Sequence, residues 1–131
     1  MLLGSSQSVR ERFVNLISRF ISLVVVRLPD DVFSALVSAS KSESSTHVKL
    51  VYEAIFRNLE IAAQRNVPLC QDTGVLEFFV GLGEGFTHAG DLLKAIREAV
   101  VRATNEGFLR PNVVDPVTGR NTGDNTGLGH P

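Results

Sequence analysis

The segment 46–65 constrains the fold most, because its apolar residues recur at three- and four-residue steps. This spacing puts them all on one face of a helix, with charged residues filling the other positions. The apolar positions are Val48, Val51, Tyr52, Ile55, Leu59 and Ala62, and the charged ones are Lys49, Glu53, Arg57 and Glu60. The sequence therefore predicts an amphipathic helix over about 46–65, ended by Asn66, Val67 and Pro68.

Three further segments show weaker helical periodicity. Residues 8–26 carry one apolar stripe, and a short helix is expected around residues 32–37 before the polar run 38–45. The last helix is expected over about 87–106, with Gly107 at its C-terminal cap. Helices therefore dominate the predicted fold.

Residues 75–82 have the composition of a strand, since they are rich in β-branched and aromatic side chains and are followed by glycines. The sequence therefore predicts a helix-rich α+β fold with at least one buried strand at about 75–82. A single apolar strand would leave its edges unpaired. We accordingly expect an incomplete domain that is completed by more chain or by a partner.

Residues 109–131 form a tail rich in glycine, asparagine and proline, in which long helices are excluded and no separate core is expected. The net charge of −1 over 131 residues provides no general attraction to nucleic acid. The apolar stretch 20–26 is too short to span a membrane. With a single cysteine and no convincing signal peptide, a cytoplasmic protein is expected.

The pentapeptide CQDTG at residues 70–74 lies between a predicted helix end and the predicted strand, where rigid elements hold polar side chains at a junction. On residue chemistry alone, a lone cysteine such as Cys70 is more often a small buried hydrophobic residue. A Cys–His catalytic pair is open, although the spacing selects no histidine. Asp72 alone suggests a turn or helix cap, and Arg110 alone suggests a surface residue.

Two other patterns carry little functional weight. The glycines of GLGEG at 81–85 have GxGxG spacing rather than the GxGxxG of dinucleotide loops. The three histidines form no local ligand pair, which disfavours a zinc site.

The CQDTG segment resembles the signature of the class I (iron-sulfur) fumarate hydratase and L-tartrate dehydratase alpha subunits. The preceding NLEIAA at 58–63 also matches, as do LRPNVVDP at 109–116 and NTGDNT at 121–126. The resemblance covers nearly the whole chain from Pro29 onward. It implies that residues 1–131 are a single N-terminal segment of a fumarase-type alpha subunit.

The resemblance implies a 4Fe-4S cluster held by three cysteines, of which Cys70 matches the first. The sequence contains no second cysteine, so only one of three expected ligands is present. Gln71 and Asp72 are implied to contact the substrate, with Asp72 taking a catalytic part in proton handling. Arg110 matches an arginine that binds a substrate carboxylate. Asn121, Asp124 and Asn125 are implied to shape the wall of the active site.

The implied activity is reversible hydration of a small dicarboxylate, such as fumarate to malate, by a lyase that is inactive as this isolated chain. The implied partners are the remaining alpha region and a beta-type subunit. Two alternatives stay open: a non-catalytic, degenerate fragment that acts only in assembly, and an unrelated binding module whose five-residue match is accidental.

Overall fold

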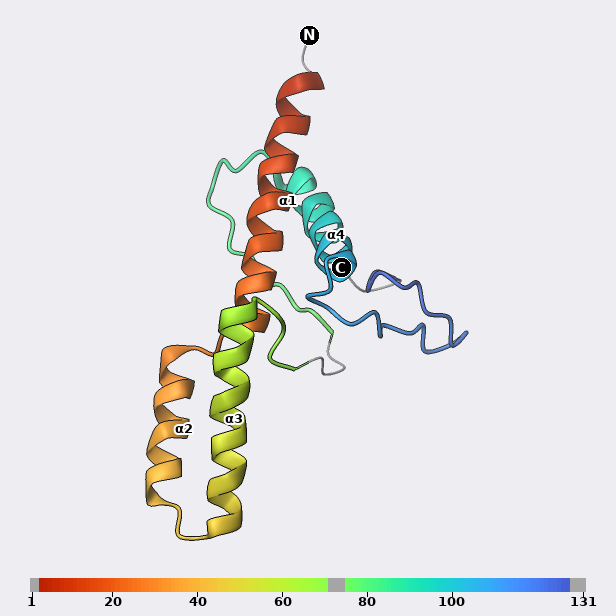
Figure 1. Ribbon diagram of the computed structural model, residues 1–131. Helices are drawn as coiled ribbons and strands as arrows, with labels where there is room; N and C mark the ends of the chain where they lie inside the picture. Colours follow the sequence, from red (N-terminus) through yellow and green to blue (C-terminus); the bar gives the residue numbers. More distant parts are fainter. Residues whose placement is uncertain (1–2, 71–74, 128–131) are drawn as a thin grey trace. The chain divides into compact units, whose positions relative to one another are not determined.

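The computed structural model describes residues 3–70 and 75–127, which contain four helices (Figure 1). These are α1 (Leu3–Val26), α2 (Asp30–Ser42), α3 (Thr46–Arg65) and α4 (Ala89–Asn105). The helix predicted over 46–65 is confirmed at both ends. No helix in the described part of the chain combines the length and apolar character that a membrane span requires. The chain divides into two compact units, Leu23–Cys70 and the remainder.

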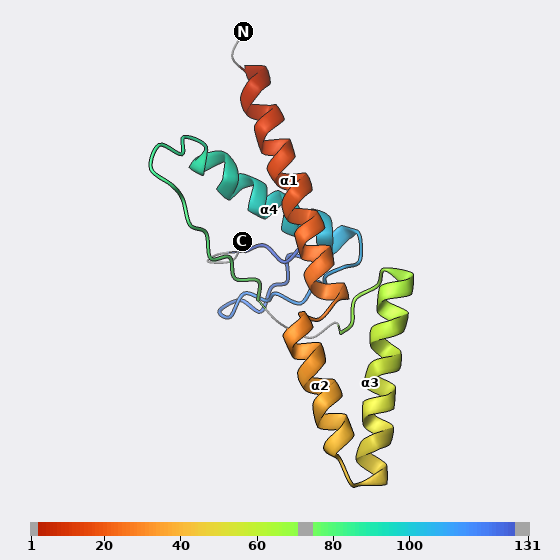
Figure 2. The same cartoon turned by 90° about the vertical axis from the view of Figure 1, so that its left-hand side faces the viewer.

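In the unit Leu23–Cys70, α2 and α3 lie side by side as an antiparallel hairpin (Figures 1 and 2). Phe33 of α2 meets Phe56 of α3 edge to face, with ring centroids 6.1 Å apart, and Phe56 also stacks on Tyr52. Asn66 ends α3 in the left-handed conformation (φ 52°), with its backbone N–H donating to the carbonyl oxygen of Ala62. Asparagine tolerates this conformation better than most residues, which explains the sharp helix end.

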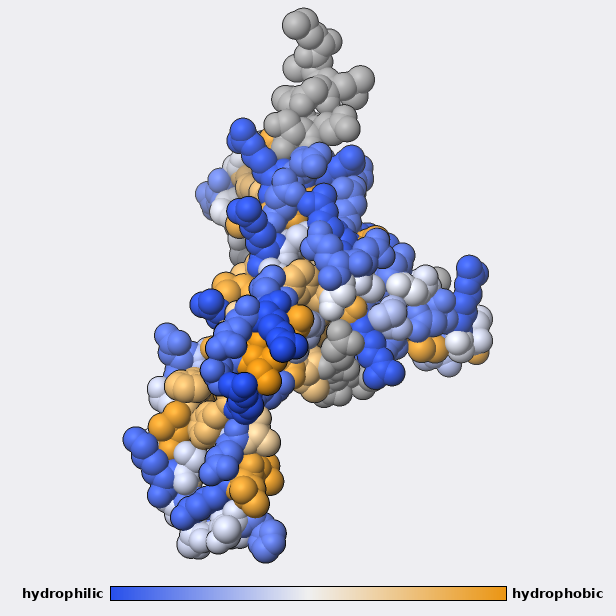
Figure 3. All heavy atoms as spheres, viewed as in Figure 1, coloured by the Kyte–Doolittle hydropathy of each residue, from blue (hydrophilic) through white to orange (hydrophobic). Residues whose placement is uncertain are grey.

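The hairpin buries little of its apolar surface. None of the side chains of α2 is buried, and in α3 only Ala62 is. Apolar side chains stay exposed on both helices, namely Val32, Phe33, Val48, Leu50 and Val51. Figure 3 shows apolar side chains gathered along this hairpin. Two helices can cover each other on one side only, so the hairpin by itself leaves an exposed apolar patch. Exposed apolar patches often mark contact surfaces.

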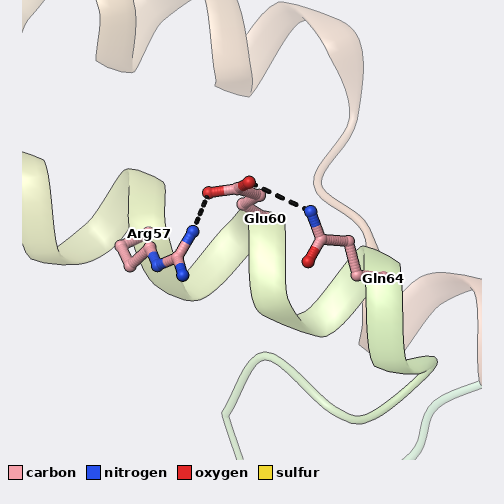
Figure 4. A network of polar contacts seen from close by, with 3 residues as sticks. All are labelled: Arg57, Glu60 and Gln64. Atoms are coloured by element: carbon pink, nitrogen blue, oxygen red, sulfur yellow. Dashed lines mark hydrogen bonds and ion pairs between the residues drawn. The ribbon is translucent and has the colours of Figure 1, made fainter.

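The polar face of α3 carries a short network of side chains. The carboxylate of Glu60 accepts hydrogen bonds from the guanidinium of Arg57 and from the amide of Gln64, the latter at 3.0 Å (Figure 4). These partners lie three and four residues from Glu60, and such exposed pairs contribute about 0.2–0.5 kcal/mol each to a helix. The network is therefore a solvated helix face, as the sequence predicted for these charged positions.

The second unit has its core where the N-terminal part of α1 packs on α4. Three alanines of α4, Ala95, Ala99 and Ala103, are fully buried there, and small side chains let two helices approach closely. The other buried members of this cluster are Val14, Ile21 and Val100. At its edge, Arg10 pairs with Glu98 at 3.4 Å and Arg102 donates to Asn15.

The predicted buried strand at 75–82 is wrong: this segment is irregular, and within the described residues the only strand-like pairing is an isolated bridge between Val114 and Asn121. Leu76 and Phe78 are half-buried against the α1–α4 core, whereas Phe79 is 93% exposed. The alternating apolar side chains therefore pack on helices and not in a sheet. The α+β assignment is corrected accordingly, because the described chain consists of helices and loops.

Candidate functional site

Cys70 lies in the short segment that follows α3, and its side chain is exposed. The residue before it is anchored twice: the N–H of Leu69 donates to the carbonyl of Val25 at 2.9 Å, and its own carbonyl accepts from the Asn58 side chain at 2.9 Å. The backbone therefore enters the CQDTG segment from a fixed position. Gln71 and Asp72, the other two predicted residues of that segment, lie outside the described residues.

Arg110 belongs to the other unit and follows the C-terminal end of α4. Gly107 there adopts φ 82°, a conformation that glycine reaches without strain. The N–H groups of Phe108 and Leu109 both donate to the carbonyl of Ala103, and the side chains of these two residues pack on the core. The chain thus leaves α4 through an anchored turn, and the next side chain, that of Arg110, is exposed.

The side chain of Asn125 holds the segment that begins at Arg110. Its Nδ2 donates to the carbonyl of Arg110 at 2.9 Å and to the hydroxyl of Thr104 at 3.1 Å. Its Oδ1 accepts from the backbone N–H groups of Asn112 at 3.1 Å and Val113 at 3.3 Å. Asn125 is only 7% exposed. The described part of the predicted tail, residues 109–127, is therefore a hydrogen-bonded loop fastened to α4.

A tight turn over residues 115–120 forms the tip of this loop. The Asp115 carboxylate accepts from the N–H groups of Val117 at 2.9 Å and Thr118 at 2.8 Å. The hydrogen bond from the Thr118 N–H, followed by that from Val117, holds the pKa of Asp115 below its usual range. The turn closes where the N–H of Asp115 donates to the carbonyl of Arg120.

Asp124 has a lowered pKa for similar reasons. The largest cause is the hydroxyl of Thr122, and the next is the backbone N–H of Thr126, which donates to the Asp124 carboxylate. The Thr122 hydroxyl also lies 2.7 Å from the carbonyl oxygen of Thr126. Both aspartates therefore act as structural acceptors within the loop. Neither has the raised pKa of a carboxylic acid that is set up to donate a proton near neutral pH.

Acidification should loosen the turn at Asp115. Because folding lowers the pKa of this group, its contribution to stability is present above the ordinary aspartate pKa of about 3.9 and is lost as the pH falls through the folded value. We expect the backbone amide NMR signals of Val117 and Thr118 to titrate with a midpoint below about 3.9. Asp115→Asn, which still accepts hydrogen bonds, should abolish that titration. A midpoint at or above the ordinary value would contradict the assignment.

The loop also borders a cavity of about 470 Å³ in the same unit. The residues that line it include one arginine, one aspartate and three threonines, and they are Val113, Asp115, Thr118, Arg120, Thr122, Thr126 and Gly127. Arg110 does not line it. The cavity therefore gives no added support to the predicted role of Arg110.

Within residues 3–70 and 75–127, no three His, Cys, Asp or Glu side chains gather closely enough to hold a metal ion. The only thiol of the chain is that of Cys70, whereas iron-sulfur clusters are held by several cysteine thiolates. The donor set in these 131 residues therefore does not fit a complete 4Fe-4S site.

Sequence comparison identifies the class of protein. Residues 14–128 match the family described as fumarate hydratase (Fumerase), and the chain belongs to this family. The matched residues include the CQDTG segment, Arg110 and the loop 109–127 that Asn125 holds. The resemblance seen in the sequence is therefore confirmed.

The chain is most informatively compared with two alpha subunits. It is 37% identical over 128 residues to the L(+)-tartrate dehydratase subunit alpha of Escherichia coli K12, covering 98% of this chain and 42% of that protein. It is 44% identical over 108 residues to a putative L(+)-tartrate dehydratase subunit alpha of Methanocaldococcus jannaschii, covering 81% and 38%. The chain thus spans about two fifths of the length of these relatives.

Sequence reasoning missed the role of Thr104 and the burial of Asn125. Thr104 is 8% exposed and donates to the carbonyl of Val100 at 2.8 Å. A polar residue on the apolar face of a predicted helix was the available signal. For Asn125, which has φ 61°, the signal was an asparagine in a glycine-rich turn, since asparagine is enriched in the left-handed region.

Proposed function

We propose that this chain is part of a hydro-lyase that reversibly adds water across the double bond of a small dicarboxylate such as fumarate. The family match over residues 14–128 carries this proposal. The alpha subunits of tartrate dehydratases that the chain resembles support a dicarboxylate with hydroxyl groups as the alternative substrate. Both substrates present two carboxylates flanking the reacting carbons.

We assign Cys70 as one ligand of a 4Fe-4S cluster whose other ligands lie outside these residues. Its exposure supports this role, because a thiolate must reach a cluster that is shared with other chain segments. A bound cluster of this kind would supply Lewis-acid chemistry at the substrate hydroxyl. Gln71 and Asp72, which follow directly in the sequence, are assigned to the substrate, with Asp72 handling a proton.

Arg110 is assigned to a substrate carboxylate. Its guanidinium has two parallel N–H donors that match the two oxygens of a carboxylate, and its backbone is held by Asn125. Binding of the carboxylate fixes the substrate and offsets the negative charge that develops when the neighbouring carbon loses its proton. The side chain thereby both orients the substrate and favours the reaction.

We further propose that the chain works together with the rest of an alpha region and with a beta-type subunit. The relatives are named as alpha subunits. The apolar side chains exposed on the α2–α3 hairpin also provide surface for such contacts. The base that removes the carbon-bound proton would come from these partners.

The test is to purify the chain anaerobically with its natural partners and to assay the complex with fumarate and with L-tartrate. Turnover of either, together with iron and acid-labile sulfide, is the expected result. The single cysteine favours a second candidate, a non-catalytic assembly subunit. A complex with neither iron nor turnover would refute the first proposal and support the second.

A further inference from the structure

Asn125 makes four hydrogen bonds that differ in what they hold. As an acceptor, its Oδ1 binds the N–H groups of Asn112 and Val113 and so closes the loop. As a donor, its Nδ2 binds the carbonyl of Arg110 and the hydroxyl of Thr104. The donor half therefore ties the backbone of Arg110 to α4.

The attachment is rigid at both ends. Asn125 and Thr104 are each more than nine-tenths buried, and the hydroxyl of Thr104 is itself oriented by donating to the carbonyl of Val100. Buried hydrogen bonds of this kind are costly to break, because each lost partner leaves a desolvated polar atom unpaired. The backbone of Arg110 thus has a fixed position relative to the most buried helix of its unit.

We propose that Asn125 is a positioning residue for Arg110, which sets where the guanidinium meets a substrate carboxylate; this inference rests on the proposed function. Asn125 does not itself contact the substrate. It acts through the Arg110 backbone, and a displacement of about 1 Å at a binding group can lower the rate about 100-fold. The residue therefore influences substrate binding at a distance.

Asn125→Asp separates the two halves of the side chain. An aspartate at this position still accepts from the Asn112 and Val113 N–H groups, but it has no N–H to donate to the carbonyl of Arg110. In the assembled protein we expect the backbone N–H groups of Asn112 and Val113 to stay protected from hydrogen exchange. We expect KM for fumarate or L-tartrate to rise about tenfold or more. This is the effect of losing one hydrogen bond between the displaced Arg110 guanidinium and the substrate carboxylate.

Asn125→Gly provides a second variant in case a buried carboxylate prevents folding. Glycine adopts the observed backbone conformation without strain, and it removes all four hydrogen bonds without adding charge. We expect it to lose the amide protection and to raise KM at least as much. Thr122→Val is the matched control, since it removes a hydroxyl of the same loop that interacts with Asp124 and Thr126 and not with the segment at 110–113. Its KM should stay within about twofold.

A double-variant cycle decides whether Asn125 acts through Arg110. If it does, combining Asn125→Asp with Arg110→Ala should lower kcat/KM no further than Arg110→Ala alone, because residues that act as one unit are not additive. Losses of kcat/KM that multiply in the double variant would overturn the positioning role. An unchanged KM in both Asn125 variants, while Arg110→Ala is impaired, would overturn it too. An unmodified complex without turnover, or an unimpaired Arg110→Ala complex, would instead refute the function proposed for the site.

Discussion

Replacing Cys70 with serine is expected to remove the iron-sulfur cluster from the assembled protein and to lower turnover more than about 100-fold. The loss should exceed the 10–100-fold effect typical of removing a partner outside the ligand shell. Cys70 is the only thiol of the chain, and a serine hydroxyl is a poor substitute for a thiolate on iron. Iron and sulfide content, with visible absorption of the anaerobic complex, measures the effect.

The stability of the isolated chain, without a cluster, should hardly change in the same variant. The Cys70 side chain is exposed, and surface substitutions usually alter the free energy of unfolding by less than about 0.5 kcal/mol. Leu69→Ala is the matched control: it trims a half-buried neighbour while keeping the backbone hydrogen bonds to Val25 and Asn58. It should lower the unfolding temperature and leave the iron content intact. Unchanged iron in Cys70→Ser would show that this cysteine is no ligand.

The helices were predictable because helix formation depends on local spacing. The periodicity of 46–65 indicated both ends of α3. The end of α2 was predicted too early, because the polar run from Ser38 was interpreted as a break. In the structure α2 continues to Ser42. The hydroxyls of Ser40 and Ser42 donate to backbone carbonyls of the preceding turn, so their hydrogen bonds are made within the helix.

The strand was predicted wrongly because strand formation depends on a partner that the segment itself does not specify. Residues 75–82 have strand composition, but β-propensity largely measures how well side chains fit a half-buried surface. The surface available to Leu76 and Phe78 is the α1–α4 core and not a neighbouring strand. The composition was therefore misleading about secondary structure, and it indicated burial only in part, since Leu76 and Phe78 are half-buried while Phe79 and Val80 are exposed.

The site could be predicted only in its local parts. The turn at Asp115 follows from local chemistry, since aspartate often binds backbone N–H groups two or three residues ahead. The contact from Asn125 to Thr104 joins residues 21 positions apart, and that from Asn125 to Arg110 spans 15. No local pattern encodes such pairings, so the burial of Asn125 became visible only in the fold.

Replacing Arg110 with lysine is the second large effect that we expect. Lysine keeps the charge but loses the planar pair of donors, so one charge-assisted hydrogen bond to the carboxylate is lost. Such a bond contributes about 1.5–3 kcal/mol, which corresponds to a drop of about 10–150-fold in kcat/KM. Steady-state kinetics of the assembled protein with fumarate and L-tartrate measures it.

Arg120→Lys separates a specific role of Arg110 in carboxylate binding from a general sensitivity of the loop to exchanging arginine for lysine. Arg120 is an exposed arginine of the same loop, and its backbone carbonyl keeps its bond to Asp115 after the exchange. We expect kcat/KM to stay within about twofold in this control and both variants to unfold at the unmodified temperature. Equal losses in the two variants would mean that the loss is not specific to Arg110, since both substitutions keep the positive charge. Normal turnover in Arg110→Lys would remove Arg110 from the substrate site, because a bidentate contact does not survive the loss of one donor.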